Sequence, residues 1–219
     1  LSWSRNQHWK GDMARRSNTD ERRGQIVAAL QAVMAKAGYA GATVAAIARH
    51  AELAPGLVHY HFKDKREILV ALVDSLAGYA HQRYESRAAE AQTAEQRLQA
   101  YIAAHLAYGS DAQPDAVAAW VMIGEQSAHD PDVREVYQAV LAAQMKLLKG
   151  LLRQRFAERG RRVRGLDALV AGITCFIQGA FTLSTTARPL LPTAFAAPTL
   201  IAWVERYIDG EEELSLIHI

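Results

Sequence analysis

Cysteine is almost absent from this sequence: Cys175 is the only one among 219 residues. A single thiol excludes a disulfide framework within the chain, and it also excludes the paired-cysteine motifs that hold zinc. Such a composition is typical of proteins that work in a reducing compartment. We therefore expect a cytoplasmic protein without structural disulfides.

Long apolar runs are also lacking, although half of the residues are hydrophobic. A helix that spans a bilayer needs about 20 consecutive apolar residues. The stretch 166–185 comes closest, but Asp167 and Gln178 interrupt it, so we interpret it as a buried helix and expect no membrane partner. Residues 1–12 contain no apolar core and therefore do not resemble a secretory signal.

Motifs that carry catalytic chemistry are missing as well. The sequence contains no glycine-rich phosphate-binding loop, no His-Glu-x-x-His pair and no metal-ligand spacing. Single histidines on helices are more often structural or surface residues than catalysts. We expect a protein that is not an enzyme, with no catalytic residues, no cofactor and no metal site.

Strand patterns are absent too, because apolar residues recur at steps of three and four almost throughout the chain. Capping residues such as Thr43 and Asp64, together with Gly and Pro, mark where helices begin and end. The sequence therefore predicts an all-α fold. The expected helices cover 19–37, 130–158, 167–187 and 199–208, with others that begin near residues 43, 55, 64, 93 and 114 and a loop over 189–198.

The net charge of +2 is unevenly distributed along the chain. Residues 1–65 contain ten Lys and Arg against five Asp and Glu, whereas residues 66–219 contain fifteen against eighteen. A basic N-terminal third is consistent with a module that faces nucleic acid. It is equally consistent with a solvated basic tail, and charge alone does not decide between the two.

Residues 43–62, with the sequence TVAAIARHAELAPGLVHYHF, predict two short amphipathic helices around a break of about three residues. This is the spacing of a helix-turn-helix. The second helix contains Gly56, Leu57, His59 and Tyr60, which cannot all be core residues, so part of it should be exposed and able to enter the major groove. Lys65 lies in the first turn of the next helix, where it can reach the phosphate backbone.

This segment resembles the signature of the TetR family of transcriptional regulators. The matching residues are Thr43 to Ala48, Val58 to Phe62 and Asp64 to Glu67, and the similarity extends over about residues 22–72. The resemblance implies an all-α homodimer with its DNA-binding heads at one end. It also implies that the last two long helices form a four-helix interface, and that Tyr60 contacts a phosphate.

Two positions depart from the family pattern. Ala54 replaces the usual Ser that caps the recognition helix, and His59 replaces the first aromatic residue of the usual pair. We favour a DNA contact for His59 over helix packing, packing for His61, and a core position for Phe62. The predicted DNA-binding residues are Thr43, Pro55, Gly56, Leu57, His59, Tyr60 and Lys65.

The C-terminal part of the chain predicts an apolar cavity between helices with a few polar groups, which is typical of a small-molecule site. For Trp120 a core position is the stronger alternative, and for Glu125 a solvated position is equally open. The predicted ligand-binding residues are Tyr101, His105, Trp120, Glu125, Gln178 and Phe181.

The same part resembles the choline-responsive BetI branch of the family, through Trp120, the run 127–131 and the stretch 177–179. That branch usually has an acidic residue where Gln178 stands and a second Trp where Gly124 stands. Because a quaternary ammonium group is bound by an aromatic cage with negative charge nearby, these departures argue against choline. A cationic or amphipathic ligand remains open through Glu125.

The sequence thus predicts a three-helix helix-turn-helix DNA-binding domain over 13–65 and a helical ligand-binding and dimerisation domain over 66–213. We expect residues 1–12 and 214–219 to be non-native or disordered ends. The predicted function is a TetR-type transcriptional repressor that leaves its double-stranded operator when an unknown small molecule binds the homodimer. The alternatives are a helical interaction module and a DNA-binding regulator without a ligand.

Overall fold

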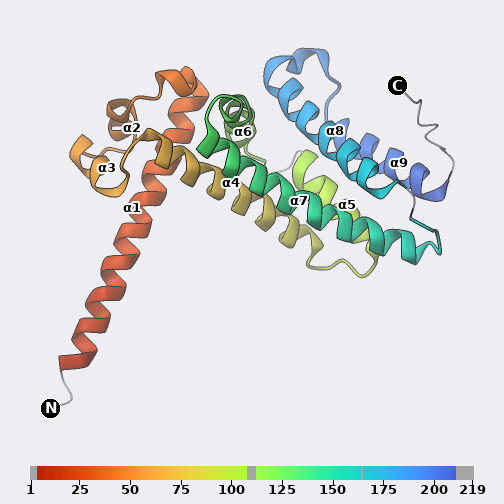
Figure 1. Cartoon of the computed structure of the whole chain (residues 1–219), viewed down its shortest axis with the longest axis horizontal. Helices are drawn as coiled ribbons and strands as arrows, with labels where there is room; N and C mark the ends of the chain where they lie inside the picture. Colours follow the sequence, from red (N-terminus) through yellow and green to blue (C-terminus); the bar gives the residue numbers. More distant parts are fainter. Residues whose placement is uncertain (1–3, 108–111, 164, 211–219) are drawn as a thin grey trace. The chain divides into compact units, whose positions relative to one another are not determined.

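Helices form all the regular secondary structure in the part of the chain that the computed structural model describes (Figure 1). That part comprises residues 4–107, 112–163 and 165–210, with side chains described from Asn18 onward. The all-α prediction is therefore confirmed. In chain order the elements are α1 (Ser4–Gly41), α2 (Val44–His50), α3 (Pro55–His61), α4 (Lys65–Ala88), α5 (Ala94–Leu106), α6 (Pro114–Ser127), α7 (Pro131–Glu158), α8 (Leu166–Thr186), the 3-10 turn η1 (Arg188–Leu190) and α9 (Ala196–Asp209).

The first helix is longer than the sequence pattern predicted. It begins at Ser4 rather than near Thr19, and it is assigned as far as Gly41 rather than Ala37. Gly38 interrupts it with a φ of 68°, a left-handed conformation that glycine adopts without steric cost. The expected foreign origin of residues 1–12 stays a prediction, and residues 214–219 lie outside the described part.

Boundaries near the C-terminal end differ as well. The predicted loop over 189–198 contains most of η1 and also the first turn of α9, which begins at Ala196 rather than Thr199. Helix α5 begins at Ala94, next to the predicted start near residue 93, and ends at Leu106. Apolar periodicity indicates a helix axis well, but it does not fix where the last hydrogen-bonded turn closes.

The chain divides into two compact units. The first contains the residues up to Ser75 together with Met122–Val136, and the second contains Leu76–Val121 together with the residues from Tyr137 onward. Helices α4 and α6 therefore each run through both units. The domain boundary that we expected at residue 65 falls inside the first unit, at the start of α4.

The first unit is built on α1, α2, α3 and the beginning of α4. Thr43 caps α2 by accepting a hydrogen bond from the Ala46 amide at 3.1 Å. Asp64 likewise accepts from the Glu67 amide at 2.9 Å, and the Glu67 carboxylate accepts from the Lys63 amide at 2.8 Å. The largest side chains that are almost fully buried in this unit are those of Ile26, Leu30, Met34, Ile47, Phe62, Ile68, Leu69, Leu72 and Ile123.

The second unit packs α5 against α9 and α8 around a continuous apolar core. A buried arginine, Arg155 on α7, lies beside this core. Its guanidinium binds Glu205 of α9 at 2.5 Å, Glu95 of α5 at 2.6 Å and Glu158 of α7 at 2.9 Å. The hydrogen bonds to Glu205, and next that to Glu158, raise the pKa of Arg155, and the negative charges of Glu205 and Glu95 raise it further. The group therefore stays charged and joins three helices.

Helix α8 is less buried than we expected. By length and composition Leu166–Thr186 could cross a membrane, yet only 22% of its most apolar window is buried within the chain. Leu169, Val170, Ile173 and Ile177 face the core. The opposite face, which includes Gly172, Cys175, Gly179 and Leu183, is exposed. The interpretation of this stretch as a buried helix therefore does not hold for most of its surface in a single chain.

We expect Arg155→Met to lower the free energy of unfolding by about 2–4 kcal/mol, because three carboxylates would lose their shared counter-charge. Urea denaturation followed by circular dichroism measures this change. Arg153→Met is the matched control, since Arg153 is exposed on the same helix, and it should cost less than about 0.5 kcal/mol. Equal losses for the two variants would contradict a structural role for the cluster.

Candidate nucleic-acid interface and effector cavity

Helices α2 and α3 form a helix-turn-helix. The turn between them is closed by backbone hydrogen bonds, from the Ala51 amide to the Ile47 carbonyl and from the Leu53 amide to the Ala48 carbonyl, both at 2.9 Å. Glu52 adopts a φ of 56° at this point, the left-handed region that a tight reversal requires. The spacing predicted from the sequence is thus present in the structure.

Helix α1 holds both short helices in place. The Gln25 side-chain amide donates to the Ala51 carbonyl at 2.7 Å, which fixes the end of α2. Arg23 donates to the His61 carbonyl at the end of α3, lies 3.9 Å from the Phe62 ring centroid, and pairs with Glu67 at 3.5 Å. Sequence reasoning missed these two positioning residues, because their partners are distant in the chain.

One face of α3 is exposed while the other packs inward. Val58 is buried and Leu57 half-buried. Pro55, Gly56, His59 and Tyr60 are exposed, and 72% of Tyr60 is accessible. A Cβ added at Gly56 would meet no atom within 4 Å, so the surface there is open. Four of the predicted DNA-binding residues therefore lie together on the exposed face of α3.

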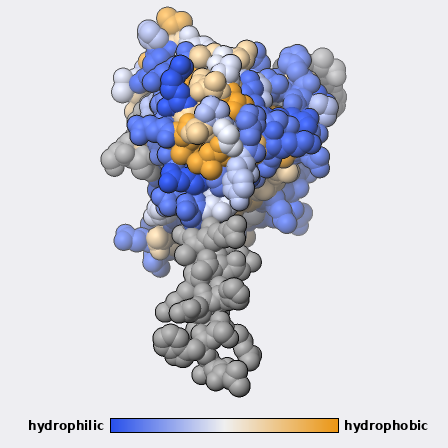
Figure 2. Space-filling view, turned by 90° about the vertical axis from the view of Figure 1, so that its left-hand side faces the viewer, coloured by the Kyte–Doolittle hydropathy of each residue, from blue (hydrophilic) through white to orange (hydrophobic). Residues whose placement is uncertain are grey.

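The face of the molecule viewed in Figure 2 is mostly hydrophilic, with an apolar patch near its centre and further apolar residues at its top. Because the outer residues of α3 are exposed, this helix can approach the edges of bases without first losing packing contacts. The absence of a side-chain cap at Ala54, noted as a departure from the family pattern, is seen directly, and Pro55 occupies the first turn instead.

Lys65 occupies a more enclosed position than we expected. Its ammonium group donates to the Tyr39 carbonyl at 2.8 Å and lies 4.0 Å from the centre of the Tyr39 ring. Burial lowers its pKa. An ammonium group carries three N–H donors, so this placement is compatible with a phosphate contact. Thr43 is exposed at the start of α2, but its hydroxyl accepts from Ala46.

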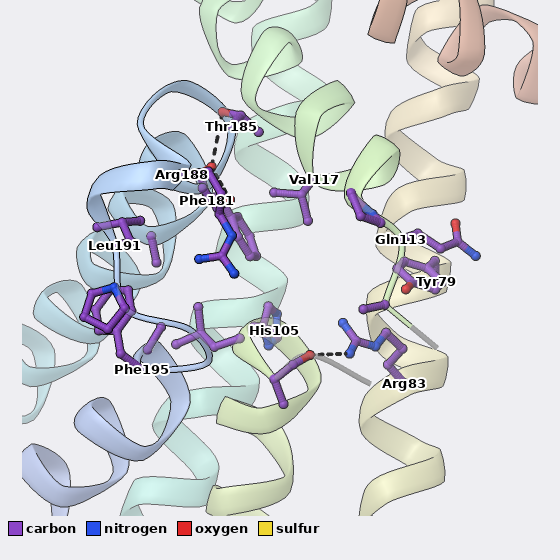
Figure 3. A pocket seen from close by; sticks show the side chains of 18 residues that line it. Tyr79, Arg83, His105, Gln113, Val117, Phe181, Thr185, Arg188, Leu191 and Phe195 are labelled. Atoms are coloured by element: carbon purple, nitrogen blue, oxygen red, sulfur yellow. Dashed lines mark hydrogen bonds between the residues drawn. The ribbon is translucent and has the colours of Figure 1, made fainter. Parts of the chain in front are cut away.

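The second unit contains a partly open cavity of about 240 Å³, lined by α4, α5, α6, α8, η1 and the start of α9 (Figure 3). A smaller adjoining cavity of about 50 Å³ shares several of its walls. Most of the lining is apolar, with Val117, Phe181, Leu191 and Phe195 among the larger side chains. Such a space suits the apolar part of a small molecule.

The predicted ligand-binding residues are only partly brought together by these cavities. His105 and Phe181 line both, and Trp120 lines the smaller one. The Trp120 indole donates to the Gln178 side-chain oxygen at 2.9 Å, so these two residues satisfy each other. The Trp120 ring also lies 4.7 Å from that of Tyr137.

Three of the predicted ligand residues, Tyr101, Glu125 and Gln178, line neither cavity. Tyr101 is buried in the core, where its hydroxyl donates to the Gln144 carbonyl at 3.4 Å and burial raises its pKa. Glu125 is exposed and belongs to the first unit. It follows the apolar run of α6, and its exposure agrees with the solvated alternative left open by the sequence.

His105 is an unusual polar group in the cavity wall. Its Nδ1 lies 2.9 Å from the Tyr101 carbonyl, one turn earlier on α5. Its Nε2 is buried and has no hydrogen-bond partner among the described residues. Burial lowers its pKa, the Tyr101 carbonyl raises it, and the nearby charge of Arg83 lowers it. Sequence reasoning selected His105 but missed Tyr79, Arg83 and Arg188, which line the cavity from α4 and η1.

An exposed recognition helix in one unit and an apolar cavity in the other define a helix-turn-helix DNA-binding transcription regulator. The chain belongs to the TetR family, with a BetI-type C-terminal domain. Residues 26–72 match the family described as "Bacterial regulatory proteins, tetR family", and residues 94–211 match "BetI-type transcriptional repressor, C-terminal". The resemblance drawn from the sequence is confirmed, and the class is a regulator rather than an enzyme.

Two characterised relatives illustrate the range of the family. The HTH-type transcriptional regulator BetI of Burkholderia mallei (strain NCTC 10229) is 29% identical over 182 residues, which cover 80% of this chain and 87% of that protein. The fatty acid metabolism regulator protein of Bacillus subtilis (strain 168) is 26% identical over 147 residues, which cover 67% of this chain and 74% of that protein.

Two solved structures share the fold. A transcriptional regulator from Saccharomonospora viridis, in complex with choline, superposes with a TM-score of 0.72 at 19% identity, covering 87% of this chain and 96% of that one. FadR from Bacillus subtilis, in complex with stearoyl-CoA, gives a TM-score of 0.67 at 19% identity, covering 82% of this chain and 96% of that one.

We expect Lys65→Ala to weaken binding to every DNA sequence alike, because a phosphate contact carries no sequence information. The slope of log affinity against log salt concentration should fall by about one. Titration of fluorescent duplexes at several salt concentrations measures both quantities. Lys146→Ala, an exposed lysine of the second unit, is the charge-matched control and should leave the slope unchanged.

His59→Ala should act differently, because a side chain on the exposed face of α3 can contact a base edge. We expect a loss of about 1–3 kcal/mol that is confined to one position of the binding site. A panel of duplexes with single substitutions locates that position. A uniform loss over all duplexes would assign His59 to the backbone instead.

Proposed function

We propose that this protein is a cytoplasmic transcriptional repressor, which binds operator DNA as a homodimer and leaves it when a small molecule occupies the cavity of the second unit. The exposed face of α3 carries this proposal. Pro55, Gly56, His59 and Tyr60 are accessible on a helix that Arg23 holds in place. A rigid helix with an unpacked face, next to positive charge, is suited to the major groove.

A homodimer is supported by the exposed face of α8 and by α9 beside it. Gly172, Cys175 and Gly179 form a stripe of small residues on α8 along which another helix can approach closely. On α9, Trp203 is 50% exposed although its ring packs edge-on against Phe176 at 5.3 Å. Large apolar area of this kind is seldom left in water. A second copy of the same face would cover it.

Two copies also meet the requirement of specific DNA binding. One recognition helix contacts too few base pairs to define a site, whereas two helices in successive major grooves, about 34 Å apart, read a near-palindrome. The dimer therefore sets the distance between its two recognition helices. Any change in that distance weakens binding to a site of fixed spacing.

An effector is supported by the mostly apolar cavity of the second unit and by relatives that bind different small molecules, one choline and another stearoyl-CoA. Helices α4 and α6 run from the cavity into the first unit: Arg83 and Val117 line it, while Lys65 and Ser127 stand at the other ends. In the first unit, Arg66 of α4 pairs with Asp132 of α7 at 2.7 Å, and Arg134 donates to the Ser127 carbonyl at 2.9 Å. A ligand that shifts either helix would also displace the residues of the first unit at the other end of that helix.

Footprinting of the chain on its own upstream DNA, together with sizing of the complex, tests this function. We expect protection of two half-sites by a dimer, and loss of protection on addition of the effector. Coupling of about 1–3 kcal/mol must be reciprocal, so the effector must also bind the operator-bound dimer more weakly. Protection that no cavity ligand alters would favour a DNA-binding regulator without a ligand, and a chain that binds no duplex would refute the proposal.

We expect Gly179→Arg to convert the dimer into a monomer and to reduce operator affinity at least about a hundredfold. The reason is that a charged side chain would enter the α8 face that the proposed dimer buries. The single chain tolerates this change, since an added Cβ at Gly179 meets no atom within 4 Å. Analytical ultracentrifugation and operator titration measure the two effects. Gly78→Arg is the matched control, because Gly78 is exposed on α4 with equally open surroundings.

A Gly179→Arg variant that remains a dimer would exclude the α8 face as the interface. Helix content should rise slightly or stay constant in both variants, because arginine has a higher helix propensity than glycine. A loss of helicity confined to one variant would identify misfolding rather than dissociation.

A further inference from the structure

His105 of α5 borders both the larger and the smaller cavity of the second unit. Figure 3 shows its ring among the side chains that surround the larger one. The residue is only partly buried, but its Nε2 atom is shielded from solvent and has no hydrogen-bond partner among the described residues. Of the buried side-chain nitrogens and oxygens in the described lining of the two cavities, it is the one left in this state. A molecule in either cavity would lie against this ring.

The hydrogen bond of the other ring nitrogen determines what Nε2 can do. Nδ1 lies 2.9 Å from the Tyr101 carbonyl, one turn earlier on α5, and a carbonyl oxygen can only accept. Burial lowers the pKa of His105, which keeps the ring neutral. Nδ1 therefore carries the proton, and Nε2 presents a lone pair. A buried acceptor of this kind is unfavourable until a donor reaches it.

The rest of the lining is suited to hydrocarbon. Its larger side chains are aromatic or aliphatic, namely Val117, Phe181, Leu191 and Phe195. The hydroxyls of Ser184 and Thr185 donate to the Phe181 carbonyl within α8, so their protons are already used. A ligand is therefore surrounded mainly by apolar groups, and its hydrogen bond to His105 would be formed away from water.

The charged groups of the lining do not define a ligand in the same way. Arg83 and Arg188 line the larger cavity, but each already has an interaction partner in the chain, so neither indicates a ligand. The described lining of both cavities contains no aspartate or glutamate to balance a cation. The hydrogen-bonding state of His105, rather than charge, is therefore the feature that selects a ligand class.

We propose that the effector is a mostly apolar molecule with an O–H or N–H group, and that this group donates a hydrogen bond to His105 Nε2. This inference rests on the proposed function, because it assigns a ligand class to the same cavity. His105 is then a specificity-determining residue. A molecule of equal size without a donor leaves Nε2 unpaired, and a site built around one hydrogen bond discriminates against such a molecule.

Isothermal calorimetry on the full chain with two matched pairs of probes tests the ligand class. Octanol and heptyl methyl ether contain the same atoms, and indole and benzofuran share one bicyclic shape, but only the first member of each pair has a donor. We expect the donor to bind about three- to tenfold more tightly in at least one pair, which is the gain from one hydrogen bond. Without an acceptor in the wall the order would reverse, because the donor would lose its hydrogen bonds to water.

The pair that shows the preference identifies the kind of donor, O–H or N–H. Equal or tighter binding of both the ether and benzofuran would overturn the proposal. So would tighter binding of choline, a permanent cation, than of either donor, or a failure of both donors to bind at about 1 mM.

A variant of His105 assigns the acceptor. His105→Phe removes Nε2 but keeps an aromatic ring, so we expect octanol to bind no more tightly than its ether and indole no more tightly than benzofuran. His81→Phe is the matched control, because His81 is exposed on α4 of the same unit, and it should keep the preference. Each comparison is a ratio of two ligands on one protein, so partial unfolding does not imitate it. A preference that survives in His105→Phe would contradict the assignment.

Nitrogen NMR of the histidine rings tests the tautomer without any ligand. We expect the proton on Nδ1 and a bare Nε2, whose resonance shifts when octanol is added. The His105→Phe spectrum identifies the His105 signals by their loss. A proton on Nε2 in the chain without ligand would overturn the proposal.

Operator titration keeps this inference separate from the proposed function. If the donor probes bind with the expected preference but the chain binds no duplex, or keeps its duplex when they are added, then the ligand class stands and the proposed switch fails. If only a molecule without a donor releases the operator, the switch stands and the ligand class is wrong.

Discussion

The buried guanidinium of Arg155 is the interaction on which the second unit depends. It binds carboxylates from α5, α7 and α9, and one of these, Glu158, also accepts hydrogen bonds from the Ala94 and Glu95 amides at the start of α5. A buried cation is stable only where its charge and its donors are all matched. Three helices are thereby held at defined distances, and two of them, α5 and α9, supply walls of the cavity.

Arg155 has its charge and donors matched, whereas two other features of the single chain do not have a partner within its described part. They indicate what else the chain binds. The buried Nε2 of His105 has no partner among the described residues, and the outer face of α8 leaves apolar side chains in water. Both are unfavourable for an isolated chain. We attribute the first to a small molecule and the second to another copy of the chain, because one is an enclosed polar atom and the other an extended apolar surface.

In the first unit, too, contacts between helices hold a short element in place. A helix of seven residues such as α3 is too short to be stable alone, so Val58 packs inward and Arg23 fixes the helix end. Because α1 supplies this support, the outward face of α3 is free of any packing role. Its side chains are therefore available for contact with DNA without loss of the packing that holds the helix in place.

The sequence alone determined the features that depend on residues a few positions apart. The helical periodicity, the cap at Thr43, the turn before Pro55 and the core position of Phe62 are of this kind, and they were sufficient to indicate the family. Local interactions are set by the chain itself, whatever the rest of the fold does.

Only the tertiary structure decided which helices face one another. The pairing of Trp120 with Gln178, the meeting of Arg83, His105 and Arg188 around one cavity, and the exposure of Glu125 depend on how whole helices pack. A periodic pattern shows that a residue lies on an inward or outward face, but it does not identify the partner helix. Contacts between residues distant in sequence depend on axial shifts and rotations that no local signal records.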